Sequence, residues 1–173
     1  MIYFSGCHHF QHANIIIHCG RNFINVGQMN RYMIDVHNEI VKPEDTVYML
    51  GDFFWGRNSR SGNSVKLESI LKQMNGHKHL ILGNHDEFSP FAYVRAGFES
   101  VHTSLMVEDF YLVHDPAVSC IDRRQKFLCS HVHDLFKKQK NVLNVGVDVW
   151  AYKPVSIDEA YKEFGYVEKS ICY

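Results

Sequence analysis

Histidine, aspartate and asparagine residues occur in short clusters along this sequence, at 7–9 (CHH), 51–52 (GD), 83–86 (GNHD), 114 and 130–133 (SHVH). The chain has 12 histidines among 173 residues, and histidine is the commonest metal ligand among side chains. An excess of histidine alone would also fit a histidine-rich surface. Imidazole, carboxylate and amide groups together suit divalent transition metals, so the clusters predict a metal site.

A centre that holds two metal ions needs a carboxylate that reaches both of them, and Asp52 is the natural candidate. Gly51 precedes it and permits a close approach of the backbone. His131 and His133 are separated by one residue, so in an extended segment they would point to opposite faces and give one imidazole to each ion. Taken alone, these sequences are also ordinary turn sequences, and only their combination and order favour the metal site.

The elements that must position these clusters are predicted as alternating strands and helices. The strands are expected at 2–5, 46–50, 79–82, 105–107, 111–113, 127–129 and 142–145, and the helices at 28–41, around 67–74, and after a capping box at 156–159. In α/β sheets, ligand sites form beyond the carboxyl ends of strands, so clusters far apart in the sequence can converge. No linker or repeat interrupts this order, which predicts one α/β domain over residues 1–173, with sheets that are parallel early and antiparallel late.

The composition limits the partners that the chain is expected to have. A formal net charge of −1 gives no overall basic field for nucleic acid or an anionic membrane surface, so a negatively charged substrate must be held by local charge. The sequence has five cysteines without a C-x-x-C spacing and shows no secretory signal, from which we expect reduced thiols and a cytoplasmic location. No apolar run approaches the roughly 20 residues of a membrane span.

The ordered blocks GDFFWG (51–56), GNHD (83–86), His114 and SHVH (130–133) resemble the signature of the calcineurin-like metallophosphoesterases. Residues 12–23, 42–52 and 144–156 are also similar to a small bacterial and phage subgroup of that family, so the resemblance covers nearly the whole chain. It implies a four-layer α/β/β/α sandwich, in which two mixed sheets are flanked by helices.

The resemblance also implies two divalent metal ions (Mn, Zn, Fe or Ni) and hydrolysis of a phosphomonoester or phosphodiester by metal-activated hydroxide. The implied substrate is a small phosphorylated molecule, for instance a nucleotide or another phosphodiester. His85 would be an acid near the ligands that protonates the leaving group or steadies charge in the transition state. The implied ligands are His9, Asp52 and His133 for one ion, and Asp52, Asn84, His114 and His131 for the other, and Cys7 is a further candidate ligand for the first ion.

Two positions depart from the family pattern. Cys7 stands where the family has the first aspartate of D-x-H, and Ser130 stands in place of the glycine of G-H-x-H. A thiolate at Cys7 could retain the metal and favour zinc or iron, or it could weaken the site. Cys7 could also be a small buried hydrophobic residue. His8 is expected to be a neighbour of the site, although it could substitute for Cys7 as a ligand.

Two further residues are expected near the substrate. Arg21 and His12 follow the first cluster and could contact a phosphate, with ordinary surface placement as the alternative. The alternative function is a catalytically weakened binding module with the same fold, in which Cys7 impairs one metal site. His85 argues against this alternative, because a binding module has no need of an acid.

Overall fold

The strands of the computed structural model, which describes residues 1–56, 62–120 and 124–165, form two five-stranded sheets. In spatial order, the first sheet contains β10 (Val155–Ser156), β1 (Ile2–Ser5), β2 (Thr46–Leu50), β3 (His77–Ile81) and β4 (Ser100–His102). The second contains β5 (Leu105–Val107), β6 (Phe110–Leu112), β7 (Lys126–Cys129), β9 (Val142–Asn144) and β8 (Lys138–Gln139).

Both sheets are mixed. In the first sheet β1, β2, β3 and β4 are parallel, and β10 pairs antiparallel to β1. In the second sheet β6, β7 and β9 are parallel, with β5 and β8 antiparallel at the edges. The expectation that the late strands are antiparallel therefore holds at the edges of the second sheet and is wrong for its centre. Its connections are long enough to cross over and return the chain in the same direction.

Alternation along β2 shows how the sequence forms two cores. Val47 and Met49 pack into a core between the first sheet and its helices. Leu50 is buried in a second core, between the two sheets, and Tyr48 packs against it. Successive side chains of a strand point to opposite faces, so this strand is apolar throughout because both of its faces are covered.

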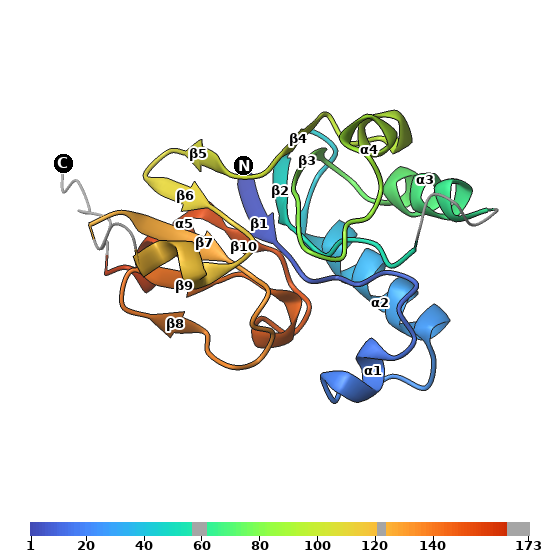
Figure 1. Ribbon diagram of the computed structural model, residues 1–173, viewed down its shortest axis with the longest axis horizontal. Helices are drawn as coiled ribbons and strands as arrows, with labels where there is room; N and C mark the ends of the chain where they lie inside the picture. Colours follow the sequence, from blue (N-terminus) through green and yellow to red (C-terminus); the bar gives the residue numbers. More distant parts are fainter. Residues whose placement is uncertain (57–61, 121–123, 166–173) are drawn as a thin grey trace.

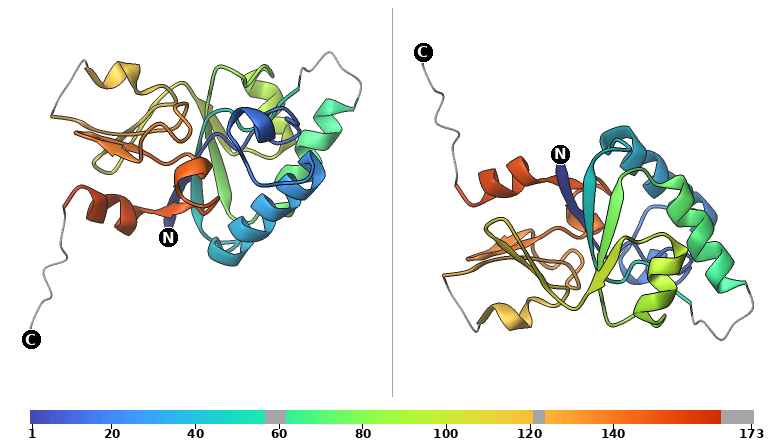
Figure 2. Two further views of the ribbon diagram at one scale, coloured as in Figure 1. Left: turned by 90° about the horizontal axis from the view of Figure 1, so that it is seen from below. Right: turned by 90° about the horizontal axis from the view of Figure 1, so that it is seen from above.

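Helices flank the sheets, as Figures 1 and 2 show: α2, α3 and α4 cover one side of the first sheet, and the second sheet lies on the other side. The α-helices are α1 (Ile15–His18), α2 (Val26–Ile40), α3 (Asn63–Gln73), α4 (Pro90–Ala96) and α5 (Ile157–Glu163), and the 3-10 helices are η1 (Pro116–Cys120) and η2 (Val147–Val149). Helix α5 contacts β1 and β10, and η1 contacts β7. The predicted α/β class with two mixed sheets and flanking helices is confirmed.

Local signals set the helix ends. The side chain of Asn25 accepts a hydrogen bond from the Gln28 N–H at 2.9 Å, so α2 begins two residues before the predicted start. The predicted capping box of Ser156 and Glu159 is present at α5. Among the described residues, none of the helices has the length and apolar character needed to cross a membrane.

Candidate metal centre

The site residues predicted for the first sheet follow the carboxyl ends of β1, β2 and β3. The pairing of β1 with β2 continues past both strands: Cys7 N–H donates to the Gly51 carbonyl at 2.9 Å, and His9 N–H donates to the Asp52 carbonyl at 2.8 Å. This extension places Cys7 and His9 directly beside Asp52.

Two glycines let the neighbouring loops come this close. Gly51 has φ of +80°, and a Cβ there would lie 2.3 Å from His114 Nδ1. A Cβ on Gly83 would lie 2.3 Å from Asp52 Oδ1. The Asp86 carboxylate then joins the two loops, because its Oδ2 accepts hydrogen bonds from the N–H groups of Asp52 and Gly83, each at 2.8 Å.

The second sheet contributes from the carboxyl ends of its own parallel strands. His131 and His133 follow β7, and His131 N–H donates to Cys7 Sγ at 3.0 Å. Gly6, after β1, forms a parallel bridge with Gly146, after β9. The two sheets are thus joined at the edge where the polar clusters lie.

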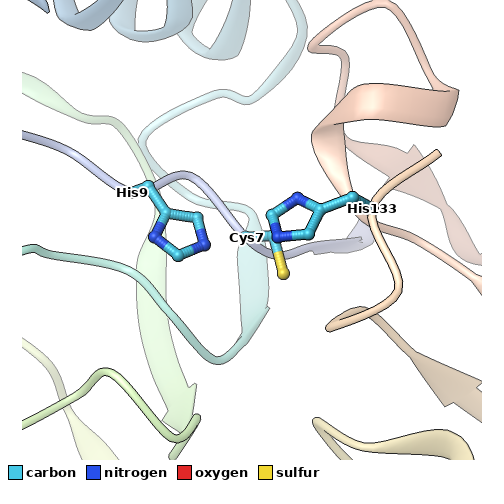
Figure 3. Close-up of side chains that lie close together, drawn as sticks. All are labelled: Cys7, His9 and His133. Atoms are coloured by element: carbon cyan, nitrogen blue, oxygen red, sulfur yellow. The ribbon is translucent and has the colours of Figure 1, made fainter. Parts of the chain in front are cut away.

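Cys7, His9 and His133 form one group of potential metal ligands (Figure 3). Their Sγ and ring nitrogen atoms all lie within 4.8 Å of one another. The centroids of the two imidazole rings are 5.3 Å apart. One sulfur and two nitrogen donors at this spacing suit a soft or borderline cation such as zinc or iron.

A second group of potential metal ligands, with ligand atoms also within 4.8 Å of one another, consists of Cys7, Asp52 and His114. Cys7 therefore belongs to both groups. Asp52 also links the groups: its Oδ2 lies 3.5 Å from His9 Nε2 and 3.4 Å from His114 Nε2. Its other oxygen, Oδ1, accepts a hydrogen bond from His85 N–H at 2.8 Å. The backbone therefore holds one oxygen and leaves the other facing both histidines.

The ring of His114 has a defined orientation. Its Nδ1 donates to the Leu50 carbonyl at 2.9 Å, which leaves Nε2 toward Asp52. The hydroxyl of Ser130, the residue that replaces a family glycine, lies 3.0 Å from the same Nδ1 and donates to the same carbonyl. This departure from the family pattern thus adds a polar contact on the side of His114 away from Asp52.

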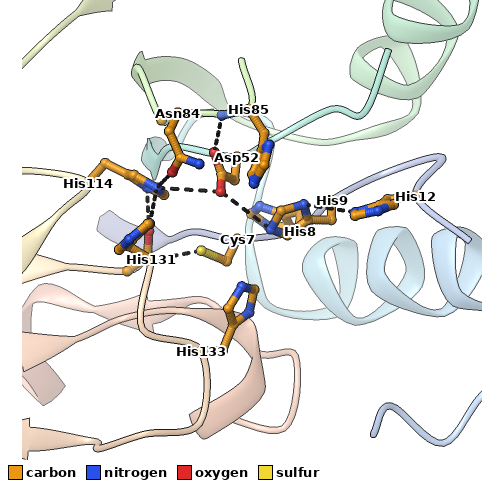
Figure 4. A network of polar contacts seen from close by, with 12 residues as sticks. Cys7, His8, His9, His12, Asp52, Asn84, His85, His114, His131 and His133 are labelled. Atoms are coloured by element: carbon orange, nitrogen blue, oxygen red, sulfur yellow. Dashed lines mark hydrogen bonds and ion pairs between the residues drawn. The ribbon is translucent and has the colours of Figure 1, made fainter. Parts of the chain in front are cut away.

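Asn84 and His131 complete the cluster around His114. Asn84 Oδ1 lies 3.0 Å from His114 Nε2, and His131 Nδ1 lies 3.1 Å from the same atom. Figure 4 shows these three side chains on one side of Asp52 and Cys7, with His9 on the other. The structure therefore brings together all seven residues that the sequence predicted as ligands.

The protonation states of His9 and Asp52 suit metal binding. Burial lowers the pKa of His9 to about 3, so this ring is neutral at neutral pH. Burial opposes ionisation of Asp52, but the hydrogen bond and charge of His114 keep the pKa of that carboxyl at about 2. His9 and Asp52 are consequently not an ion pair despite their proximity. Burial also raises the pKa of the Cys7 thiol, so a cation must displace its proton.

One buried atom in this cluster lacks a hydrogen-bond partner among the described residues. It is His9 Nε2, the atom that faces Asp52 Oδ2, and His9 is only 2% exposed. Buried polar atoms without a partner are rare, and a neutral imidazole nitrogen facing a carboxylate is a suitable pair of donors for a divalent cation. The residues present therefore fit the metal ions that the sequence predicts.

Several of the predicted ligands have an uncommon backbone conformation. A positive φ is uncommon for residues other than glycine, and such residues cluster at functional sites. Five of the predicted ligands have it: Cys7 (+52°), His9 (+53°), Asp52 (+49°), His131 (+56°) and His133 (+48°).

Asp148, in η2, was not among the predicted site residues. Its Oδ2 lies 2.8 Å from His133 Nδ1. The hydrogen bond to Asp148 raises the pKa of His133 to about 9, and despite burial the pKa of Asp148 is lowered by its bonds to His133 and Arg21. Asp148 lies within block 144–156, which the sequence linked to the family without giving the residue a role.

The predicted role of Arg21 as a direct substrate contact is not supported by its geometry. Arg21 is buried, and its Nε and Nη2 donate to Asp148 at 2.8 and 3.0 Å. Nη2 also donates to the Cys7 carbonyl at 2.7 Å, and Nη1 to the His8 carbonyl at 2.9 Å and Met29 Sδ at 3.6 Å. These contacts account for all five guanidinium donors, so Arg21 holds the loop after β1.

A pocket of about 550 Å³, here called the polar pocket, opens at His12 and His85, whose rings lie near the ring of His9. Its lining includes Gln11, His12, Asn14, Trp55, Lys66 and His85. His12 stacks on Trp55 with ring centroids 3.8 Å apart, and burial lowers the pKa of His12 to about 4. His12 therefore borders this pocket as a neutral ring. His85 is half-buried, and its ring centroid is 5.6 Å from that of His9.

His8 points away from the site into the core. It stacks on Phe10 with ring centroids 5.4 Å apart, and its Nε2 contacts Ser5 Oγ at 3.2 Å. It belongs to none of the ligand groups found among the described residues, in keeping with the expectation that it is a neighbour.

Two mixed sheets with potential histidine and carboxylate ligands at their joined carboxyl edges are the arrangement of a metallophosphoesterase fold. The family profile described as calcineurin-like phosphoesterase matches residues 2–168, and the chain belongs to this family. It is 33% identical to the uncharacterized protein MJ1445 of Methanocaldococcus jannaschii, over 98% of this chain and 96% of that protein.

Two solved structures are similar to the chain. One is the protein of unknown function AQ665 from Aquifex aeolicus, with a TM-score of 0.70 and 25% identity over 94% of this chain and 98% of that one. The other is the Pseudomonas putida nuclease MPE, with a TM-score of 0.52 and 22% identity over 76% of this chain and 61% of that one. The second likeness shows the fold alone.

Proposed function

We propose that this protein is a phosphoesterase that hydrolyses a phosphomonoester or a phosphodiester at a dinuclear metal centre. One observation carries the proposal: Asp52 Oδ2 lies between His9 Nε2 and His114 Nε2, and the buried His9 nitrogen has no hydrogen-bond partner among the described residues. A carboxylate oxygen that faces two imidazoles is an arrangement that suits a bridged pair of cations.

The donor set divides into two partly shared halves. Cys7, His9 and His133 would hold one cation, Asn84, His114 and His131 would hold the other, and Asp52 would contact both. When bound, the ions supply Lewis-acid charge to the phosphoryl oxygens and make water more acidic. The candidate metals are Mn, Zn, Fe and Ni, and a thiolate at Cys7 favours Zn or Fe in the first half.

His85 is proposed to donate the proton that the departing alkoxide requires. Its N–H bond to Asp52 Oδ1 fixes its backbone next to the ligands, while its ring lines the polar pocket. A leaving group in that pocket would lie beside this ring. General acid catalysis of this kind contributes about 10²- to 10⁴-fold to a rate.

The substrate is proposed to be a small phosphorylated molecule, a nucleotide or another phosphodiester among the candidates. The net charge of −1 supplies no general attraction for anions, and the guanidinium of Arg21 is fully engaged within the protein. The phosphate is therefore proposed to be held mainly by the cations, and Lys66 is a cationic side chain in the lining of the polar pocket.

Asp52→Ala tests the dinuclear centre. We expect it to lose both metal ions and the hydrolysis of bis(p-nitrophenyl) phosphate while it keeps the fold, measured by elemental analysis, turnover and circular dichroism. Asp35→Ala, which removes an exposed carboxylate on α2, is the matched control. Near-wild-type hydrolysis by Asp52→Ala would refute the two-metal mechanism. A wild type that binds metal but hydrolyses no phosphoester would instead favour the binding module weakened at Cys7.

A further inference from the structure

A second pocket, here called the apolar pocket, has a volume of about 800 Å³ and borders the metal centre at Asn84, His114 and His131. Its apolar lining consists of Leu82, Tyr111, Val113, Val118 and Phe127. The site residues themselves form one wall of this pocket, so a molecule bound at the centre can extend into it.

We propose that the apolar pocket binds the retained ester group of a phosphodiester, and that this group is uncharged and preferably aromatic. The inference rests on the proposed function and narrows its substrate class to diesters of this kind.

The two pockets lie on different sides of the centre. His114, Asn84 and His131, which border the apolar pocket, lie to one side of Asp52 and Cys7, whereas His9 and His12 lie to the other (Figure 4). His12 and His85 line the polar pocket. A phosphomonoester has one organic group and would use one pocket, but a phosphodiester has two and would use both.

The position of His85 determines which group leaves. Because its ring lines the polar pocket, the alkoxide that it protonates must depart there. The group in the apolar pocket consequently stays attached to phosphorus. In the overall step, the oxygen of a water molecule forms a bond to phosphorus and the bond from phosphorus to the leaving alkoxide breaks. His85 gives a proton to the alkoxide. Of the two protons of the water molecule, one replaces the proton lost from His85 by way of solvent, and the other stays on the new phosphate oxygen or passes to solvent.

The charges around the apolar pocket select an uncharged group. Asp115 lines the apolar pocket, and none of the described lining residues is a lysine or an arginine. A second phosphate on the retained group would meet this carboxylate, and no lysine or arginine among the described lining residues would compensate its charge. The pocket therefore suits the end of a molecule and disfavours a continuing polyanionic chain.

The walls of the apolar pocket are held in place before a ligand arrives. Val113 and Phe127 are 5% and 4% exposed and pack together in a small core on the second sheet. The hydroxyl groups of Tyr111 and Ser104 are 2.8 Å apart and hydrogen-bonded. The lining combines these apolar and aromatic side chains with polar ones such as Thr103 and Gln125, and a preformed pocket of this kind is typical of small-molecule sites and suits a planar ring.

Three substrates with the same leaving group test the proposal: p-nitrophenyl phosphate, methyl p-nitrophenyl phosphate and phenyl p-nitrophenyl phosphate. We expect kcat/KM for the phenyl diester to exceed that for the methyl diester by about 10- to 100-fold, the effect of burying one ring. The monoester should be the poorest of the three.

A charge placed in the apolar pocket should reduce this preference. Val118 is 38% exposed on η1, so Val118→Glu can fold, and it should lower the ratio of phenyl to methyl kcat/KM by about tenfold. Val94 is a matched control, because it is 44% exposed on α4 and lines neither pocket. Val94→Glu should leave the ratio as it is in wild type.

Binding of phosphonates gives a readout that does not depend on turnover. Calorimetry should show phenylphosphonate binding more tightly than methylphosphonate to wild type and Val94→Glu, with the difference reduced in Val118→Glu. If the diesters are hydrolysed but the phenyl and methyl groups are equivalent in both assays, the inference is overturned and the proposed function stands. If no ester is hydrolysed, the proposed function fails, and phosphonate binding still decides whether the pocket accepts a ring.

Discussion

Asp148 Oδ2 lies 2.8 Å from His133 Nδ1, and Asp148 Oδ1 lies 2.8 Å from Arg21 Nε. One buried carboxylate thus connects a candidate ligand to a buried arginine that also holds the backbone of Cys7 and His8. A carboxylate that orients a histidine in this way commonly tunes the affinity of a metal site.

Asp148→Asn should lower the affinity for metal at the His133 half of the centre by about 10- to 100-fold. The amide keeps the shape of the side chain but removes the charge that orients the imidazole and balances Arg21. A titration against a competing chelator measures the affinity, with Asp35→Asn as the exposed control. Equal affinities for wild type and Asp148→Asn would contradict a role for this contact in metal binding.

The contact between His133 and Asp148 also predicts how the stability of the metal-free protein depends on pH. The bond to Asp148 raises the pKa of His133 to about 9, above the value of about 6.5 expected in the unfolded chain. The contribution of this hydrogen bond to the free energy of unfolding is therefore fully present below about pH 6.5 and is lost as the pH rises through about 9. Urea unfolding with chelator present should show a steeper loss of unfolding free energy over this range in wild type than in Asp148→Asn. Parallel curves would show that the pair does not have this effect.

Metal binding should release protons in a pattern that identifies Cys7 as a ligand. At pH 7.5 His9 and Asp52 carry no proton to lose, because the pKa values are about 3 and about 2. Cys7 and His133 are protonated, since both pKa values are raised. Despite burial, the hydrogen bond and charge of Asp52 also raise the pKa of His114. Full loading should thus release about two protons from Cys7 and His133, together with any that His114 carries, measured by calorimetry in buffers of different ionisation enthalpy. Cys7→Ala should release about one proton fewer than wild type, and an unchanged number would exclude Cys7 as a thiolate ligand.

His85→Ala should leave the metal content unchanged and lower turnover by about 10²- to 10⁴-fold, the usual range for a lost general acid. The decrease should be larger for a substrate with a poor leaving group than for a nitrophenyl ester, because nitrophenolate needs little protonation. Elemental analysis together with turnover of both substrates separates the outcomes. Loss of metal from His85→Ala would mean that this residue is a ligand.

Gly51→Ala should lower the metal affinity and the stability by more than backbone strain alone would explain. Gly51 and Gly62 have φ of +80° and +87°, so alanine carries a similar strain at either position, about 1 kcal/mol. Only at Gly51 would the new Cβ collide with a neighbour, His114 Nδ1, at 2.3 Å. We expect Gly51→Ala to lose metal affinity and more stability than Gly62→Ala, by thermal unfolding and metal titration. Similar losses in both would show that His114 moves aside without cost.

The sequence predicted most where the signals were local. The buried strand around Val47 and Met49 and the polar cluster that follows it at Asp52 are adjacent in sequence, so strand pattern and strand end could be read together. The capping box at Ser156 was found for the same reason. The convergence of the clusters followed from the rule that ligand sites form beyond the carboxyl ends of strands.

The contacts of Asp148 could not be predicted in this way. It is 127 residues from Arg21 and 15 from His133 in the sequence, and only the folded chain brings the three together. Arg21 was expected near a phosphate because of its residue type, whereas its burial depends on the placement of η2. Helix α4 was missed although Ser89 and Pro90 are a helix start signal, because its seven residues show too little periodicity.

The left-handed backbone at the site has a consequence for recognising distant relatives. Cys7 has φ of +52° with a thiol where the family pattern has an aspartate, so this backbone conformation does not depend on a carboxylate side chain. Side chains can be exchanged by single substitutions, whereas the strained turns depend on the packing of both sheets. We therefore expect a homologue without any of the ligands to have the same turns, with glycine at some of these positions. Such turns would identify the place of a former metal site.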